Sequence, residues 1–133
     1  MRIAIVGGTG TFGRALAERI TMLGESVVIG SRDAARASEI AAVLGVEGAT
    51  NEEAVKNADL VILAVRSNAA LETARQLAPA IGSTPLLSVA SALEFTEDGT
   101  CDVHVQALLE GGGAALVHKM QLDDTINEME IEL

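Results

Sequence analysis

A glycine-rich run near the N-terminus, Gly7-Gly8-Thr9-Gly10-Thr11-Phe12-Gly13, limits the folds open to this chain more than any other feature. It follows an apolar, strand-like run at residues 2–6 and precedes a helical pattern that begins at Arg14. A second apolar run ends about twenty residues further on, at Ser31-Arg32, which is the spacing of a dinucleotide-binding βαβ unit. The combination predicts a domain that holds a dinucleotide.

The order of the predicted elements supports the same architecture. Helices and strands are expected to alternate along the first two thirds of the chain, with strands at residues 2–6, 26–29, 46–49, 59–65 and 85–89 and helices at residues 11–23, 34–44, 51–58 and 68–81. Such alternation favours right-handed crossovers, so we expect an α/β fold with a doubly wound, mainly parallel sheet: the NAD(P)-binding Rossmann fold. The first helix has an apolar stripe that is expected to face the core, namely Phe12, Leu16, Ile20 and Leu23.

The C-terminal third is expected to extend the domain. A further helix at residues 103–109 and a sixth strand at residues 114–117 assign residues 1–120 to the dinucleotide-binding Rossmann domain. Residues 121–133 hold several acidic residues and no basic one, and they are expected to form an acidic C-terminal tail or a short helix. The alternative for this last stretch is a segment that docks on a partner subunit.

The composition narrows the class of protein. The chain has 133 residues, 49% of them hydrophobic, which suffices for one domain with a sizeable core. Its formal net charge of -10 argues against nucleic acid as a partner, and no apolar run reaches the length of a membrane span. The one cysteine, Cys101, excludes an internal disulfide framework. We therefore expect a cytoplasmic protein that binds small molecules.

Each glycine of the turn has a predicted task. Gly8 is expected to permit the tight turn out of the first strand, Gly10 to let a pyrophosphate approach the backbone, and Gly13 to let the first helix pack close to the sheet. Backbone N–H groups at the helix N-terminus are then expected to bind the phosphates. The predicted phosphate-binding set is Gly8, Thr9, Gly10, Thr11, Phe12 and Gly13.

The end of the second strand distinguishes between the two nicotinamide cofactors. An acidic residue there would bind the ribose hydroxyls of NAD, whereas this chain has Ser31 and Arg32, which suit the 2′-phosphate of NADP. Arg36, one helical turn further on, adds a second positive charge. NADP(H) is therefore the favoured cofactor. NAD stays open as the alternative, because Asp33 would serve the ribose if the register shifted by a residue or two.

Three segments together resemble a known family: Gly7-Gly8-Thr9-Gly10-x-x-Gly13, Val28-Ile29-Gly30-Ser31-Arg32 and Asp59-Leu60-Val61-Ile62-Leu63-Ala64-Val65. They resemble the NADPH-dependent reductases of the deazaflavin coenzyme F-420, in the wider 6-phosphogluconate-dehydrogenase-like Rossmann group. The resemblance covers residues 1–120. It implies hydride transfer between NADPH and a deazaflavin coenzyme in a homodimer, with the 2′-phosphate on Ser31, Arg32 and Arg36. It also implies that Val65 and Ser91 border the nicotinamide.

The chain departs from that family in two places. The family usually has a proline after the fourth strand, whereas here Val65 is followed by Arg66-Ser67. Family members also continue well past the position of Leu133, and their additional residues help to build the deazaflavin pocket and the dimer interface. The resemblance therefore carries over to cofactor binding better than to catalysis, and the catalytic residues stay unknown. Arg66 is expected to contact the cofactor or substrate, with a surface salt bridge as the alternative.

Other polar residues carry weaker signals. The family has a histidine after its sixth strand, near the active site, and His118 falls at a comparable place, with a structural role as the alternative. Cys101 and His104 form one pair of metal-ligand type with no second pair, so no metal site is expected. No further catalytic constellation stands out, which is compatible with hydride transfer, because that reaction needs mainly the alignment of two rings.

Two other classes of protein stay open. A short-chain dehydrogenase would share a similar glycine turn, but its catalytic pair needs a tyrosine and this chain has none. The second class is a non-catalytic NADP-binding sensor or subunit. A shortened reductase that depends on a partner is a further alternative.

Overall fold

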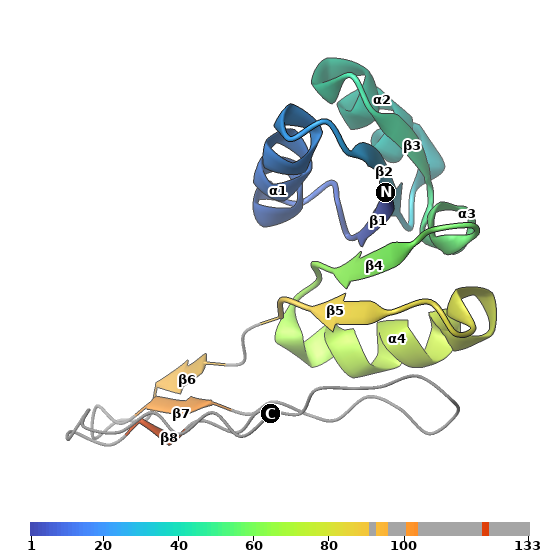
Figure 1. Cartoon of the computed structure of the whole chain (residues 1–133). Helices are drawn as coiled ribbons and strands as arrows, with labels where there is room; N and C mark the ends of the chain where they lie inside the picture. Colours follow the sequence, from blue (N-terminus) through green and yellow to red (C-terminus); the bar gives the residue numbers. More distant parts are fainter. Residues whose placement is uncertain (91–92, 96–100, 104–120, 123–133) are drawn as a thin grey trace.

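The computed structural model describes residues 1–90, 93–95, 101–103 and 121–122. Helices and strands alternate in its larger part, as predicted (Figure 1). In chain order the elements are β1 (Arg2–Val6), α1 (Thr11–Met22), β2 (Ser26–Ser31), α2 (Ala34–Leu44), β3 (Glu47–Thr50), α3 (Asn51–Val55), β4 (Leu60–Leu63), α4 (Ser67–Ile81), β5 (Leu86–Ser88), β6 (Leu93–Phe95), β7 (Cys101–Val103) and β8 (Gln121–Leu122). The bounds of β1 and α2 are those predicted, and β2 extends past its predicted end to Ser31.

The first five strands form one parallel sheet in the order β3-β2-β1-β4-β5. The order reverses between β1 and β4, because the chain returns from β3 to the far side of β1. Val6, at the end of β1, pairs with Gly30 of β2 on one side and with Leu63 of β4 on the other. This is the doubly wound parallel sheet of the Rossmann fold, and the predicted fold class is confirmed.

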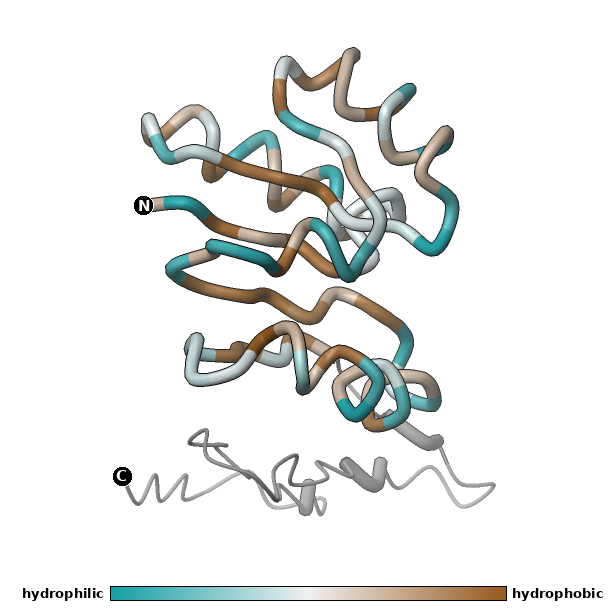
Figure 2. The backbone as a smooth tube through the Cα atoms, turned by 90° about the vertical axis from the view of Figure 1, so that its right-hand side faces the viewer, coloured by the Kyte–Doolittle hydropathy of each residue, from teal (hydrophilic) through white to brown (hydrophobic). Residues whose placement is uncertain are grey.

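The strands form the apolar middle layer of the molecule. Figure 2 shows the hydrophobic stretches of the chain running through the strands at the centre. In β4 the residues Val61, Ile62 and Leu63 are all buried, whichever face of the sheet they point to. Burial on both faces is expected of a parallel strand between two layers of helices, and it explains the continuous apolar run of β4.

Helices α1 and α2 pack on one face of the sheet, and α1 does so by a different stripe from the one predicted. The residues that α1 buries are Gly13 and Ala17, whereas Phe12 is 60% exposed and Leu23 is 80% exposed. The close approach of Gly13 to the sheet turns this line of small residues inward. The predicted stripe is therefore wrong at its two ends, while its middle residues, Leu16 and Ile20, are partly buried against the core.

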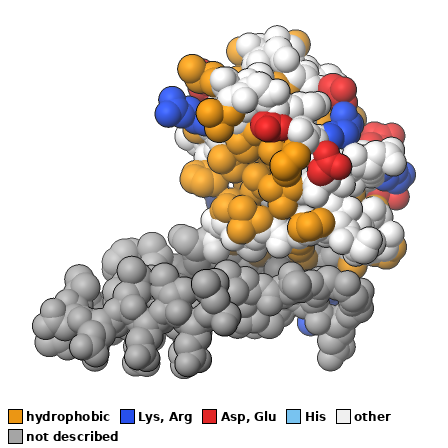
Figure 3. All heavy atoms as spheres, in the orientation of Figure 1, with side chains coloured by type: hydrophobic (Ala, Val, Ile, Leu, Met, Phe, Trp, Pro, Cys, Tyr) orange, Lys and Arg blue, Asp and Glu red, His pale blue; other side chains and the backbone are white. Residues whose placement is uncertain are grey.

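The same face carries an apolar patch beyond the two helices. The contacts of α1 are with β1 and β2, and those of α2 are with β2 and β3. On the β4–β5 side, Leu60, Ala64 and Val89 are only partly buried, and Leu87 is 48% exposed. Hydrophobic side chains accordingly gather on the face seen in Figure 3.

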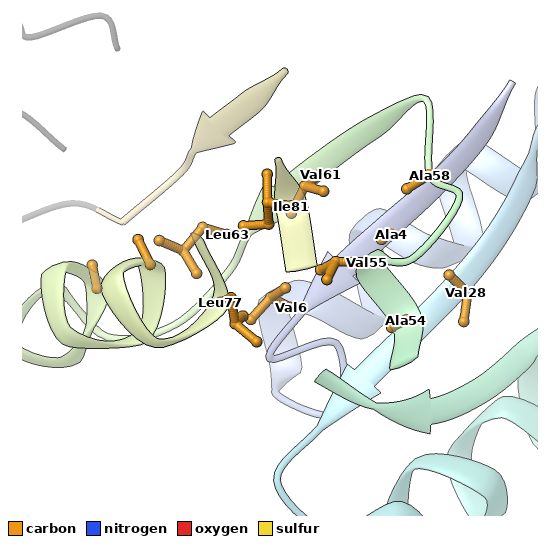
Figure 4. Packing of buried hydrophobic residues seen from close by; sticks show 12 residues of the cluster. Ala4, Val6, Val28, Ala54, Val55, Ala58, Val61, Leu63, Leu77 and Ile81 are labelled. Carbon is orange, nitrogen blue, oxygen red and sulfur yellow. The ribbon is translucent and has the colours of Figure 1, made fainter. Parts of the chain in front are cut away.

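Helices α3 and α4 cover the opposite face. Their buried residues include Val55 of α3 and Leu77 of α4, which join Val6, Val28 and Leu63 of the sheet in one hydrophobic cluster (Figure 4). A capping box begins α3, as predicted: the Thr50 hydroxyl accepts the Glu53 N–H, and the Glu53 carboxylate accepts the Thr50 N–H. The helix that follows ends at Val55, before its predicted end.

Beyond β5 the structure describes three short strands that pair in a separate antiparallel sheet, in the order β6-β7-β8. Val103, where a helix was expected to begin, ends β7, and the remainder of that helix lies outside the described residues, as does the sixth strand expected at residues 114–117. Residues 121–122, at the start of the predicted tail, form β8. None of the described helices has the length and hydropathy needed to span a membrane.

Candidate functional site

The candidate site lies where the strand order reverses. In open α/β sheets, ligands bind outside the carboxyl ends of the strands at such a switch point. Here the turn from β1 to α1, the end of β2 and the end of β4 all lie at this edge, because the three strands are parallel neighbours. The sheet thus brings together Gly7–Gly10, Ser31-Arg32 and Val65-Arg66.

Gly7 takes the left-handed conformation in the turn, with a φ of +76°. A Cβ atom on Gly7 would lie 2.8 Å from the carbonyl oxygen of Ala64 and 2.8 Å from the Cγ1 atom of Val65. The tight turn therefore depends on Gly7, and the prediction that gave this task to Gly8 is wrong. The same contact places Val65, one of the predicted site residues, directly against the turn.

Gly8 and Gly13 are needed for close packing. A Cβ atom on Gly8 would lie 2.7 Å from the Cβ of Ile29, and one on Gly13 would lie 2.7 Å from the Cα of Gly8. The N–H of Gly8 also donates hydrogen bonds to the carbonyl oxygens of Ile5, at 3.1 Å, and Gly30, at 3.0 Å. The predicted task of Gly13, to bring α1 close to the sheet, is confirmed.

Gly10 leaves open space at the start of α1. A Cβ atom there would meet only the carbonyl oxygen of Gly7, at an ordinary 3.5 Å. Gly10 is the N-cap residue, and no side chain caps the helix or places an acidic group in its first turn. The first-turn N–H groups, those of Thr11, Phe12 and Gly13, have no partner within an α-helix. An uncovered helix N-terminus of this kind suits an anion such as a pyrophosphate.

The helices on either side of α1 in sequence and space differ in this respect. Asp33 caps α2 and Thr50 caps α3, each through its own side chain. The other helix without a side-chain cap is α4, which follows β4 and begins after Arg66. The two uncapped helices therefore follow β1 and β4, the two strands that flank the switch point.

Arg14 supports the turn and was not predicted as a site residue. Its Nε atom donates a hydrogen bond to the carbonyl oxygen of Thr9 at 2.9 Å, and Thr9 itself is only 9% exposed. Arg14 also lines a groove of about 480 Å³ together with Arg36, Asp33 and Glu39 of α2. The only signal in the sequence was its place in the first turn of the helix, which many surface arginines share.

The end of β2 presents a buried hydroxyl. Ser31 is 7% exposed, and its Oγ atom accepts the N–H of Asp33 at 3.2 Å. Because this bond uses an acceptor site of the hydroxyl, its proton is available to a phosphate. The carboxylate of Asp33 accepts the N–H groups of Ala35 at 2.9 Å and Arg36 at 3.2 Å. Asp33 thus acts as the N-cap of α2, and Ser31 is the residue at the strand end.

Arg32 and Arg36 are both exposed beside this hydroxyl. The ion pairs found within the described ranges are Met1–Glu25, Arg2–Glu47 and Lys56–Glu52, so neither arginine is paired with a described carboxylate. Two unpaired guanidinium groups next to a hydroxyl donor are a chemically suitable set for a phosphate monoester. The residues that the sequence predicted for a 2′-phosphate are therefore together in the fold.

The end of β4 brings two more of the predicted residues to the edge. Val65 is half-buried against Gly7, and Arg66, at the N-cap of α4, is exposed. Ser91, His104 and His118 lie outside the described residues, and Cys101 is described only as part of β7. The site can therefore be built from the glycine turn and from the ends of β2 and β4.

Comparisons with known proteins agree with this geometry. The model of the family described as NADP oxidoreductase, coenzyme F420-dependent, matches residues 2–92. A curated relative, the F420-dependent NADP reductase of Methanothermobacter thermautotrophicus, is 35% identical over 123 residues, which are 86% of this chain and 53% of the relative. The chain thus spans about half the length of the curated relatives it matches first.

Solved structures give the same fold. A crystal structure described as an F420-dependent NADP reductase from Arthrobacter superposes with a TM-score of 0.62 and 27% identity, over 73% of this chain and 48% of that chain. Synechocystis arogenate dehydrogenase superposes with a TM-score of 0.63 and 23% identity, over 74% of this chain and 36% of that chain. The second likeness shows the fold alone.

Proposed function

The chain belongs to the family of coenzyme F420-dependent NADP oxidoreductases, and from this premise we propose that it binds NADP(H) and transfers a hydride between NADPH and a deazaflavin coenzyme. The glycine turn at the end of β1 would hold the pyrophosphate through the first-turn N–H groups of α1. NADPH, when bound, supplies the hydride, and the chain's own residues bind and orient it.

The arrangement at the end of β2 is the observation that carries this proposal. Ser31 offers a buried hydroxyl, and Arg32 and Arg36 are exposed beside it with no described carboxylate partner. Asp33, the residue that kept NAD open, uses its carboxylate to cap α2. A 2′-phosphate therefore finds positive charge and a donor here, and the ribose of NAD finds no free carboxylate at the strand end.

The nicotinamide end of the site is proposed from the exit of β4. Val65 lies against the glycine turn and Arg66 is exposed next to it, so both are placed to border a ring held outside the carboxyl end of β4. Ser91, after β5, is proposed for the same role. Because hydride transfer depends on the alignment of two rings, these residues act by positioning, and the chain needs no nucleophile.

Titration calorimetry with NADPH and NADH tests the cofactor, and the addition of oxidised deazaflavin tests the reaction. We expect tight binding of NADPH, weaker binding of NADH, and loss of absorbance in the nicotinamide band once the deazaflavin is added. Equal affinity for the two nucleotides would contradict the assignment of the β2 end. NADPH binding without turnover would contradict catalysis by this chain alone.

A non-catalytic role is the second candidate, and the share of the relatives that the chain spans favours it. The chain matches 53% and 54% of two curated reductases, so NADPH binding is retained in this reading while the deazaflavin site is supplied by a partner. The chain would then be a sensor, a subunit or a shortened reductase. Binding of oxidised deazaflavin to the purified chain, measured by fluorescence, separates this reading from the first.

We also propose that the protein works as a homodimer in the cytoplasm. The apolar patch beside β4 and β5, where Leu87 is 48% exposed, is compatible with association. Sedimentation velocity at several concentrations tests the dimer, which would give one species of twice the chain mass. A single species of the mass of one chain at all concentrations would contradict it. Cell fractionation tests the compartment, where recovery with the membrane or secreted fraction would contradict the cytoplasm.

A further inference from the structure

The N–H of Gly7 donates its hydrogen bond to a side chain from a distant part of the sequence. The acceptor is the Oδ1 atom of Asn51, at 3.4 Å in a partly buried position, and the two residues are 44 positions apart. Gly7 is the left-handed residue at the start of the turn, so this bond holds the turn at the point where it leaves β1.

Gly30 makes room for this contact. A Cβ atom on Gly30 would lie 2.8 Å from Oδ1 of Asn51 and 3.1 Å from its Cα atom. The carbonyl oxygen of Gly30 also accepts the N–H of Gly8 at 3.0 Å. The end of β2 therefore holds the glycine turn twice: its own carbonyl binds Gly8, and the space it leaves lets Asn51 bind Gly7.

The position of Asn51 is itself well determined. It is the first residue of α3, directly after Thr50, which pairs with Ser31 in the sheet and shares the capping box with Glu53. The Thr50 hydroxyl accepts the Glu53 N–H at 3.2 Å and donates to the Glu53 carboxylate at 3.0 Å. The capping box thus fixes the backbone from which the Asn51 side chain reaches the turn.

The choice of an amide at this position has a chemical consequence. The Gly7 N–H can only donate, so it needs an acceptor, and both an asparagine and an aspartate would provide one. An aspartate, however, would place a negative charge beside the turn that is proposed to hold two phosphate charges. Asparagine supplies the acceptor without that charge.

We propose that Asn51 is a positioning residue for the cofactor: it holds Gly7, and through it the phosphate-binding turn, in the geometry that binds the pyrophosphate. This inference rests on the proposed function. The pyrophosphate is common to NADPH and NADH, so Asn51 contributes equally to the binding of both. Arg32 and Arg36, in contrast, are proposed to act on the 2′-phosphate that only NADPH carries.

Calorimetry on two Asn51 variants tests the proposal, with NADPH and NADH as the ligands and thermal unfolding as the check on folding. Asn51→Ala removes the acceptor, and we expect both affinities to fall about tenfold, the scale of one hydrogen bond, with their ratio unchanged. Asn51→Asp keeps the acceptor and adds a charge, so we expect the thermal midpoint to stay near that of the wild type and both affinities to fall. The control is Gln76→Ala, which removes an exposed amide of α4 and should change neither affinity.

Hydrogen exchange at the Gly7 amide supplies a readout that does not depend on the ligand. Exchange should be faster in Asn51→Ala and unchanged in Asn51→Asp. Wild-type protein that binds neither nucleotide overturns the proposed function and this inference with it. Wild-type protein that binds NADPH as tightly as both Asn51 variants do overturns the inference alone, as does a loss confined to NADPH.

Discussion

The carboxylate of Asp33 accepts the backbone N–H of Ala35 at 2.9 Å, and this contact removes the residue that most favoured NAD from the competition for the ribose. The first prediction concerns this cap. Asp33→Ala should cost about 1 kcal/mol of unfolding free energy, because α2 loses its N-cap, whereas Asp33→Asn should cost only a few tenths, because asparagine caps as well. Chemical denaturation measures both.

The same pair of variants tests the role of Asp33 in binding. Asp33→Asn removes a negative charge near the proposed 2′-phosphate site while it keeps the cap, so NADPH affinity should rise roughly twofold to fivefold at low salt. NADH affinity should not change. A fall in NADH affinity in Asp33→Asn would show that the carboxylate binds the ribose, and the cofactor preference would have to be reversed.

The second prediction concerns the arginines at the end of β2. Arg32→Ala should weaken NADPH binding about tenfold to a hundredfold, because hydrogen bonds to charged groups are worth about 1.5–3 kcal/mol, and should leave NADH binding nearly unchanged. The double change Ser31→Asp with Arg32→Gly should lower NADPH affinity far more than NADH affinity. The matched control is Arg75→Ala, an exposed arginine on α4. Equal losses for both nucleotides would mean that the 2′-phosphate lies elsewhere.

Local patterns predicted the elements well, because their causes are local. The bounds of α2 follow from Asp33 at its start and Gly45 at its end, the latter with a φ of +67°. The capping box of Thr50 and Glu53 is likewise contained in four successive residues. The end of β2 at Ser31 was predictable in the same way, since the polar residues after Ile29 mark the edge of the sheet.

The details of the site depend on contacts that no local pattern contains. Two adjacent glycines begin the turn, and which of them takes the left-handed conformation depends on Ala64, a residue of the β4 exit that packs against Gly7. The role of Asn51 depends on the register of β2 with β3, which places it over Gly30. Arg14 is an ordinary surface residue until the turn presents the Thr9 carbonyl to it.

The third prediction follows from the corrected stripe of α1. Phe12→Ala should change the unfolding free energy by less than about 0.5 kcal/mol, because Phe12 is 60% exposed. Ala17→Val should cost about 1–3 kcal/mol, because Ala17 is fully buried against the sheet and the added methyl groups overfill the space. Urea denaturation of the two variants decides the point. A larger loss for Phe12→Ala would show that the aromatic ring is part of the core after all.

The fourth prediction separates the glycine that binds from the glycine that packs. Gly10 has a φ of -75° and a ψ of 165°, which any residue adopts, and the space around its Cβ position is open. Gly10→Val should therefore fold, at a cost of about 1 kcal/mol for a poorer N-cap residue. It should bind neither NADPH nor NADH detectably, because the side chain occupies the space proposed for the pyrophosphate.

Gly13→Ala should behave in the opposite way. Its Cβ atom would lie 2.7 Å from the Cα of Gly8 and 2.8 Å from the carbonyl oxygen of Gly7, so α1 must move away from the sheet. We expect a loss of about 1–3 kcal/mol in unfolding free energy and, because the turn moves with the helix, weaker binding of both nucleotides. Circular dichroism melts and calorimetry on the two variants give the comparison. If Gly10→Val binds NADPH like the wild type, the pyrophosphate does not lie at this turn, and the site must be sought along another strand end.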